Sequence, residues 1–104
     1  MTTPHPLSSR LARMERAFQE NFSIHYLEIE NESAKHSGHY SGDGETHWRV
    51  LIVAQDFQGV SRAQRHQKVN SLLAEEFNQG LHALSLQLFD PQEWEKKSSE
   101  HFKG

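Results

Sequence analysis

The sequence predicts a small α/β protein of the α+β class, with elements in the order α-β-β-α-β-α. Its three-stranded mixed sheet is expected to carry its helices on one side. Apolar residues recur with helical period near the start and in the middle of the chain. Three short apolar or alternating runs supply the strands. With 104 residues and 35% hydrophobic content there is room for one core, so we expect a single domain over residues 1–104 with a core of about residues 7–95.

The first helix is predicted to begin at Pro6 or Ser8 and to end at Asn21. Its apolar side chains recur with helical period and form one face, made of Leu7, Leu11, Met14 and Phe18. The opposite face is charged and consists of Arg10, Arg13, Glu15 and Glu20. Such a helix packs its apolar face on a sheet and leaves its charged face in solvent.

Two predicted strands come next in the chain. In residues 24–30 apolar and polar side chains alternate, with Leu27 and Ile29 on the same face, as in a strand that has one exposed face. Residues 47–54, H-W-R-V-L-I-V-A, are almost continuously apolar after Arg49. A run of this kind indicates a strand buried on both faces, so we expect it at the centre of the sheet.

A turn at Gly59 opens a long middle helix, whose apolar stripe is formed by Val69, Leu72, Leu73 and Phe77. Gly80 is expected to end this helix in the left-handed conformation that glycine adopts easily. The period of the pattern then falls to two. One face of the third strand is formed by His82, Leu84, Leu86 and Leu88.

The last helix is predicted from a capping box. Asp90 is the expected N-cap, Pro91 the first helical residue, and Glu93 the residue whose side chain returns to the cap. We expect this helix to be short, because residues 95–104 are charged or small and are predicted to be disordered.

The predicted topology places several histidines together. A middle helix of about 17 residues is about 25 Å long and matches a strand of about eight residues, so it returns the chain to the end of the sheet where the second strand began. The second and third strands are then parallel and start at the same edge. That edge receives four of the eight histidines, namely His36, His39, His47 and His82. The first two lie in a loop over residues 35–46, which is longer than a hairpin requires.

Composition excludes several classes of protein. No apolar run is long enough for a transmembrane helix or a secretory signal, so we expect a cytoplasmic protein without membrane association. The formal charge of −3 argues against a generally basic nucleic-acid binder. Without cysteine the chain has no disulfide, no thiol nucleophile and no complete iron–sulfur site of its own. It also lacks a nucleophile motif and a phosphate-binding loop, which argues against an enzyme.

A series of short motifs lies in order between Leu11 and Trp94. They are Asn31-Glu32-Ser33, Gly44-Glu45-Thr46-His47, Phe57-x-Gly59, Arg65-His66-x-x-Val69, Leu73-Ala74-Glu75-Glu76, His82-Ala83-Leu84 and Trp94 itself. In identity and spacing these motifs resemble the BolA family. The resemblance implies a class II KH-like fold, partnership with a monothiol glutaredoxin and a shared [2Fe–2S] cluster. It also implies a role in transcription regulation for some bacterial members.

The resemblance also implies particular ligands. The family's histidine before Ala-Leu falls on His82, and its second ligand, in the loop after the first strand, falls on His36. His39 lies three residues further on and is the alternative second ligand. Imidazole binds iron and zinc, but a chain without cysteine supplies only the histidine part of a cluster site, so thiolates must come from a partner. We therefore predict an adaptor in iron–sulfur trafficking or in iron and redox sensing, which holds no cluster when isolated.

Two other functions stay open at this stage. A basic run without acidic residues between positions 57 and 74 contains Arg62, Arg65, His66 and Lys68, and it favours a KH-like DNA-binding regulator. The G-x-x-G of KH loops is incomplete there, because Gly59 has no second glycine three residues later. A weaker alternative is a zinc-binding domain that uses the same histidines. Homodimerisation of the free protein is left open as well.

Overall fold

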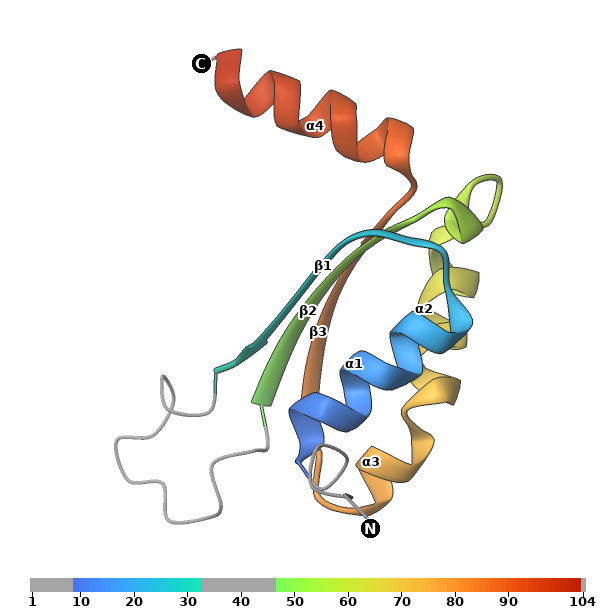
Figure 1. The fold of residues 1–104 in the computed structure, drawn as a ribbon, viewed down its shortest axis with the longest axis vertical. Helices are drawn as coiled ribbons and strands as arrows, with labels where there is room; N and C mark the ends of the chain where they lie inside the picture. Colours follow the sequence, from blue (N-terminus) through green and yellow to red (C-terminus); the bar gives the residue numbers. More distant parts are fainter. Residues whose placement is uncertain (1–8, 33–46, 104) are drawn as a thin grey trace, which may run out of the picture.

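The computed structural model describes residues 9–32 and 47–103. Along the chain the elements are α1 (Arg10–Asn21), β1 (Ile24–Asn31), β2 (His47–Ala54), the 3-10 helix η3 (Gln55–Phe57), α2 (Arg62–Leu72), α3 (Ala74–Asn78), β3 (Ala83–Phe89) and α4 (Pro91–Lys103). Figure 1 shows the three strands side by side, with α1, α2 and α3 beside them and α4 beyond one end. None of the helices in this described part is both long and apolar enough to cross a membrane.

The sheet has the predicted mixed topology. Its strand order is β1-β2-β3, with β1 antiparallel and β3 parallel to the central strand β2. His47 lies opposite Ala83 and Val53 opposite Phe89, so β2 and β3 start at one end of the sheet and finish at the other. The second strand covers the residues that its apolar run predicts.

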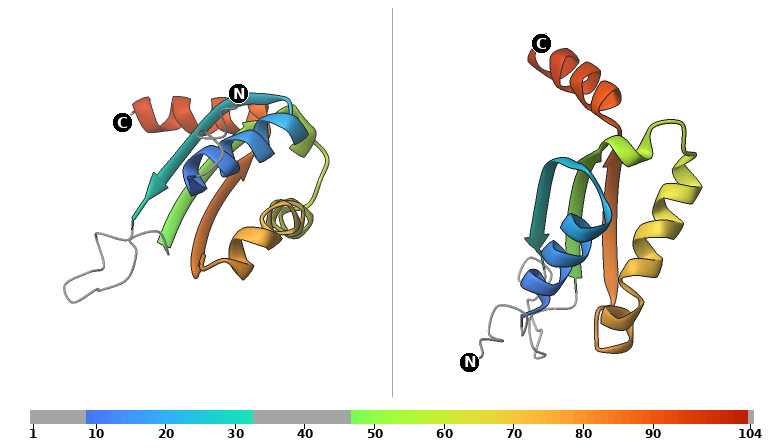
Figure 2. Two further views of the ribbon diagram at one scale, coloured as in Figure 1. Left: turned by 60° about the horizontal axis from the view of Figure 1, so that its bottom comes forward. Right: turned by 45° about the vertical axis from the view of Figure 1, so that its right-hand side comes forward.

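The hydrophobic core lies between one face of the sheet and the helices α1 and α2, and α3 lies on the same side of the sheet (Figures 1 and 2). Its largest fully buried side chains are Phe18, Phe57, Met14, Ile52, Leu73, Val50 and Val69. Burying an aliphatic or aromatic side chain of this size contributes roughly 1.5–3 kcal/mol. For these three helices the prediction of one-sided packing is confirmed.

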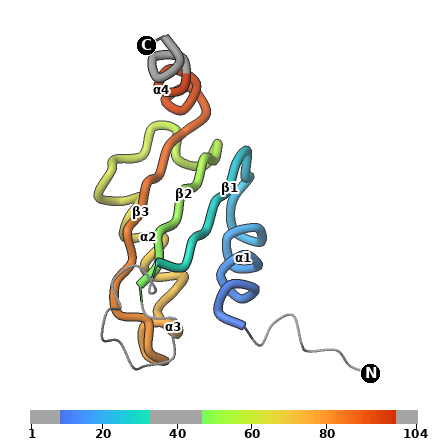
Figure 3. Tube along the Cα trace, turned by 90° about the vertical axis from the view of Figure 1, so that its left-hand side faces the viewer, coloured from blue at the N-terminus to red at the C-terminus, as the bar shows by residue number. Residues whose placement is uncertain are grey.

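The last helix departs from one-sided packing. Trp94 of α4 stacks on Tyr26 with ring centroids 5.6 Å apart and contacts Phe89 at 5.6 Å. Tyr26 and Phe89 alternate with Leu27 and Leu88, which pack on the core, so these two rings project from the second face of the sheet. The first turn of α4 therefore covers an apolar end of that second face, and the helix continues past the end of the sheet (Figure 3).

The C-terminal capping box forms as predicted, but the helix that it starts is longer than expected. The Asp90 N–H donates to the Glu93 carboxylate at 2.9 Å, and the Glu93 N–H donates to the Asp90 carboxylate at 2.8 Å. The helix then continues to Lys103, so the prediction of disorder after Trp94 is wrong. No glycine or proline interrupts the chain after Pro91 within this helix, and most of its residues are good helix formers.

The middle helix was predicted as one element and is two. It breaks at Leu73, whose φ of −102° and ψ of 15° separate α2 from α3. Phe77, predicted inside, has 37% of its surface exposed, while Glu76 is buried. The reason is that Glu76 contacts Arg10 and Arg13 of α1.

The first helix is rotated relative to its predicted faces. It begins at Arg10, because Ser9 is the N-cap and its hydroxyl accepts the Ala12 N–H at 3.1 Å. This start is later than Pro6 or Ser8. Arg10, predicted on the charged face, is 4% exposed, and Leu11, predicted inside, is 40% exposed.

The two predicted glycine turns are confirmed, with positive φ at Gly59 (78°) and at Gly80 (116°).

Candidate metal-ligating site

The starts of β2 and β3 form the candidate metal-ligating end of the sheet. Because these strands are parallel, with His47 opposite Ala83, the residue before β3, His82, lies at the same end as His47. This confirms that His47 and His82 meet at one edge. The predicted ligands His36 and His39 lie outside the described residues. We call this end of the sheet, with His47 and His82, the histidine rim.

The two histidines of the rim differ in their surroundings. His82 is exposed, and its imidazole has no hydrogen bond or ion pair within the described part of the chain. His47 is half-buried and already takes part in an interaction with another group of the protein. An open hollow of about 280 Å³ beside it is lined by Glu32, His47, Trp48, Ala83, Leu84 and Ser85. His82 is therefore the better placed of the two to bind an external ligand.

The end of β1 is held at the same rim. The Glu32 N–H donates to the His47 carbonyl oxygen at 2.8 Å. The Arg49 guanidinium bonds the Glu30 carboxylate at 2.6 Å and the Glu32 carboxylate at 3.2 Å, which ties the side chains of the two strands together. Both flanks of residues 33–46, Glu32 and His47, thus lie at the histidine rim.

The described residues do not complete a metal site by themselves. They contain no cluster of three or more histidine, aspartate or glutamate side chains that could hold a metal ion. Structural zinc sites use four protein ligands and catalytic ones use three. A complete site at this rim therefore needs ligands from residues 33–46 or from another molecule.

One member of the predicted basic surface lies inside the protein. The side chain of Arg65 is 9% exposed, and its guanidinium donates to the carbonyl oxygens of Val60 at 2.8 Å and Leu88 at 3.1 Å. It also forms an ion pair with Glu93 at 2.7 Å. This pair is the main reason why the pKa of Glu93 lies below its usual value. Arg65 joins α2 to β3 and α4, and this position does not fit the nucleic-acid contact that the sequence predicts for it.

Arg62 is the first residue of α2 and lies toward the opposite end of the sheet from the histidine rim, and His66 and Lys68 follow within the next two turns of this helix. Arg62 and Lys68 are exposed, and the ammonium of Lys68 lies 5.7 Å from the ring centroid of Phe22. The Nδ1 of His66 is 2.9 Å from the Arg62 carbonyl oxygen, so this nitrogen carries a proton and donates it. The exposed cations of the predicted patch are therefore Arg62 and Lys68.

Sequence reasoning missed an ion cluster between α1 and α3. The carboxylate of Glu76 contacts the guanidinium groups of Arg10 and Arg13, and we call these three residues the Arg–Glu cluster. One signal was present in the sequence, because Glu76 as well as Phe77 continues the spacing of Val69 and Leu73, and the structure buries Glu76. A glutamate at such a position indicates a buried partner of opposite charge.

Comparison with known proteins agrees with the fold and the motifs. The family described as BolA-like protein matches residues 18–93. The chain is 42% identical over 85 residues to the DNA-binding transcriptional regulator BolA of Haemophilus influenzae, covering 82% of this chain and 81% of that protein. Among solved structures it resembles BolA1 from Arabidopsis thaliana, with a TM-score of 0.76, 39% identity and coverage of 83% of this chain and 96% of that one.

A second structure from Arabidopsis thaliana, the BolA domain of SufE1, has a TM-score of 0.74 and 40% identity, with coverage of 84% of this chain and 98% of that domain. Both structures support the predicted three-stranded mixed sheet with helices. The Haemophilus influenzae relative is named as a transcriptional regulator, and a relative from Homo sapiens is named BolA-like protein 1.

Proposed function

This chain belongs to the BolA-like protein family, and from that premise we propose that it is a cytoplasmic adaptor that completes a [2Fe–2S] cluster held by a monothiol glutaredoxin. In this role it serves iron–sulfur trafficking or iron and redox sensing, and the isolated chain holds no cluster. The observation that carries the proposal is the position of His82, which is exposed at the start of β3 and shares the rim with both flanks of residues 33–46.

The donor set fits half of a cluster site. The 104 residues include eight histidines and no cysteine, so the chain can offer imidazole but no thiolate. His82 together with His36 or His39 would hold one iron of the cluster, and the thiolates would come from the partner. When bound, the cluster supplies one-electron redox chemistry, and histidine in place of thiolate raises its reduction potential.

Chain length allows a loop histidine to reach His82. Glu32 lies level with His47 at the rim, and β1 is two strand spacings, or about 10 Å, from β3. His36 is four residues beyond Glu32, which permits a span of up to about 14 Å. His39 is seven residues beyond Glu32 and has more chain on that side, so chain length permits both as candidates for the second ligand.

Visible absorption and circular dichroism of the protein mixed with a cluster-loaded monothiol glutaredoxin test the proposal. His82→Ala should keep the fold, because the side chain is exposed, but should abolish the spectral change that the wild-type protein causes. His36→Ala should weaken or shift this change, and only the double variant at His36 and His39 should remove the contribution of the loop. The matched control is His25→Ala, since His25 is also an exposed strand histidine but lies at the opposite end of the sheet.

Association of the two proteins must be measured separately, for example by calorimetry, because they can contact each other without sharing ligands. If His82→Ala left the spectrum of the complex unaltered while association persisted, His82 would not be a ligand. The proposed function would then be wrong.

DNA binding is the second candidate, favoured by the name of the Haemophilus influenzae relative and by the two exposed cations of α2, Arg62 and Lys68. With Arg65 buried, two phosphate contacts predict a log–log salt slope of about −2 on duplex DNA. The double variant Arg62→Glu, Lys68→Glu should abolish binding, whereas Lys96→Glu, at an exposed lysine of α4, should weaken it far less. No measurable binding at about 50 mM salt would exclude this candidate.

A further inference from the structure

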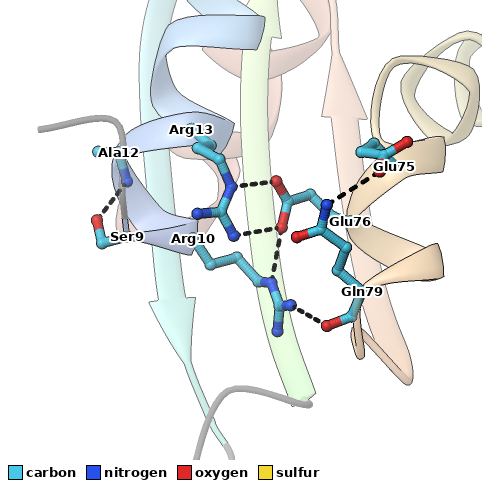
Figure 4. A network of polar contacts seen from close by, with 7 residues as sticks. All are labelled: Ser9, Arg10, Ala12, Arg13, Glu75, Glu76 and Gln79. Atoms are coloured by element: carbon cyan, nitrogen blue, oxygen red, sulfur yellow. Dashed lines mark hydrogen bonds and ion pairs between the residues drawn. The ribbon is translucent and has the colours of Figure 1, made fainter. Parts of the chain in front are cut away.

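The Arg–Glu cluster is a buried group of charges between α1 and α3 (Figure 4). Glu76 accepts hydrogen bonds from Arg10 Nε at 2.8 Å, from Arg13 Nε at 2.5 Å and from Arg13 Nη2 at 2.8 Å. The side chains of Arg10 and Glu76 are only 4% and 7% exposed. Removing charges from water is unfavourable unless they are paired and hydrogen-bonded. A movement that separated Arg10 from Glu76 would leave a buried charge unpaired by this contact, so the cluster resists such movements.

The cluster is connected to the segment that precedes His82. Arg10 Nη2 donates to the Gln79 carbonyl oxygen at 2.9 Å, and the Leu81 N–H donates to the Glu76 carbonyl oxygen at 3.0 Å. These two bonds lie on either side of Gly80, whose φ of 116° turns the chain from α3 toward β3. Both bonds therefore have a residue of the cluster at one end.

The two arginines bond the Glu76 carboxylate in different ways. Arg13 uses two of its nitrogens on the Glu76 carboxylate, in the bidentate arrangement that suits a guanidinium. Arg10 uses one nitrogen on the same carboxylate and another on the Gln79 carbonyl oxygen. Arg13 thus neutralises Glu76, while Arg10 extends the constraint from Glu76 to the turn.

We infer that the Arg–Glu cluster positions His82 for ligation, an inference that rests on the proposed role of His82 as a ligand. Among the described residues no side chain bonds the exposed imidazole of His82, so its backbone locates it there. On the C-terminal side the pairing of Ala83 with His47 holds this backbone, and on the N-terminal side the turn at Gly80 and the buried Leu81 hold it. A ligand whose backbone is already fixed loses less conformational entropy on binding.

Arg10→Met tests this inference in the full-length chain, because it removes the bonds from Arg10 to the Glu76 carboxylate and to the Gln79 carbonyl oxygen and leaves the bidentate Arg13 pair. Arg10→Lys is the conservative variant, and Arg16→Met is the matched control, since Arg16 is 57% exposed on the same helix and is ion-paired with Glu20. The first readout is amide hydrogen exchange at Leu81 relative to Ile52, a buried residue of the central strand that reports global unfolding.

Arg10→Met should raise the ratio of the Leu81 to the Ile52 exchange rate about tenfold, the effect of losing one charged hydrogen bond. Arg10→Lys should restore part of the ratio, and Arg16→Met should leave it at the wild-type value. The second readout is the spectral titration with cluster-loaded glutaredoxin, in which Arg10→Met should raise the half-saturation concentration about tenfold. The final spectrum should stay that of the wild type, because His82 is still present.

An exchange ratio and a half-saturation concentration unchanged in Arg10→Met would overturn the inference. If Arg10→Met does not fold, Arg10→Lys decides by the same ratio, and a wild-type value would then overturn it. The proposed function fails differently, through an unaltered final spectrum with His82→Ala. If His82→Ala alters the final spectrum but Arg10→Met changes neither the exchange ratio nor the half-saturation concentration, only the positioning role is rejected and the proposed function stands.

Discussion

Replacing Glu76 by glutamine removes the negative charge of the Arg–Glu cluster and nearly preserves the side-chain volume. The wild-type carboxylate accepts three hydrogen bonds, from Arg10 at 2.8 Å and from Arg13 at 2.5 and 2.8 Å. A glutamine has one acceptor oxygen, and its NH₂ group would face guanidinium donors. Two arginines, one of them almost fully buried, would lose the counter-charge that Glu76 provides.

Breaking a buried ion pair by removing one partner lowers the free energy of unfolding by about 3–5 kcal/mol. Arg13 is 31% exposed and can turn toward water, so we expect a loss near the lower end, about 3 kcal/mol. For a domain of this size that corresponds to a decrease in Tm of about 12 °C or more. The matched control is Glu75→Gln, because Glu75 is exposed and its carboxylate accepts a hydrogen bond from the Gln79 side chain. This substitution should change the free energy of unfolding by no more than about 0.5 kcal/mol.

The loss should depend on pH. Hydrogen bonds from Arg13 are the main reason why the pKa of Glu76 in the folded protein lies below its usual value, with Arg10 adding to the effect and burial opposing it. Below about pH 4.3 the unfolded chain therefore binds more protons than the folded one, and the stability that Glu76 contributes falls with decreasing pH. The difference between wild type and Glu76→Gln should be full at neutral pH and shrink on acidification.

Urea unfolding followed by far-ultraviolet circular dichroism, at pH 7 and at several lower values, measures this difference through the transition midpoint. Equal midpoints for wild type and Glu76→Gln at pH 7 would refute the assignment of Glu76 as a buried, charged anchor. So would a difference that stays constant down to acid pH, because it would then come from packing rather than from charge.

Three further predictions follow from single contacts. Arg65→Met should lower the free energy of unfolding by about 1.5–3 kcal/mol, because the buried Leu88 carbonyl oxygen loses a charged hydrogen bond. It should also weaken the near-ultraviolet signal of the Tyr26–Trp94 stack, since α4 loses its ion pair at Glu93, and an unchanged signal would mean that α4 docks without it. Gly80→Ala should cost about 1–2 kcal/mol in urea unfolding, because φ is 116°, and a neutral effect would show that the turn rearranges. Calorimetry of the isolated chain should find only weak zinc binding, lost below about pH 6 as imidazoles protonate, whereas tight, chelator-resistant zinc would favour a zinc-binding domain.

The elements that sequence reasoning predicted well depend on local patterns. The bounds of β2 follow from a continuous apolar run that ends where the polar Gln55 begins η3. The parallel pairing of β2 and β3 follows from the length of the helical segment between them, even though that segment is broken at Leu73. Because pairing depends on the total length, the shared location of His47 and His82 was predictable as well.

The features that were missed depend on tertiary partners. In α1 the apolar pattern admits two rotations that differ by one residue, and the choice between Leu11 and Arg10 as the inward position depends on Glu76, 66 residues away from Arg10 in the chain. A buried arginine is unfavourable without such a partner, and the sequence alone does not identify that partner. The second-face position of α4 likewise depends on Tyr26 and Phe89, which only the folded sheet brings next to Trp94.

The fold places the two candidate functions at opposite ends of the sheet. His82 precedes β3 at one end, whereas Arg62 begins α2 near the other, and α2 alone, with 11 residues, is about 16 Å long. A glutaredoxin at the histidine rim and DNA at Arg62 and Lys68 would therefore contact different surfaces, and each should bind in the presence of the other. Direct competition between them would mean that one surface has been assigned wrongly. One connection between the two surfaces runs through α2, the break at Leu73 and the Arg–Glu cluster. If coupling without competition uses this connection, Arg10→Met should reduce it while leaving DNA binding by the free protein unchanged.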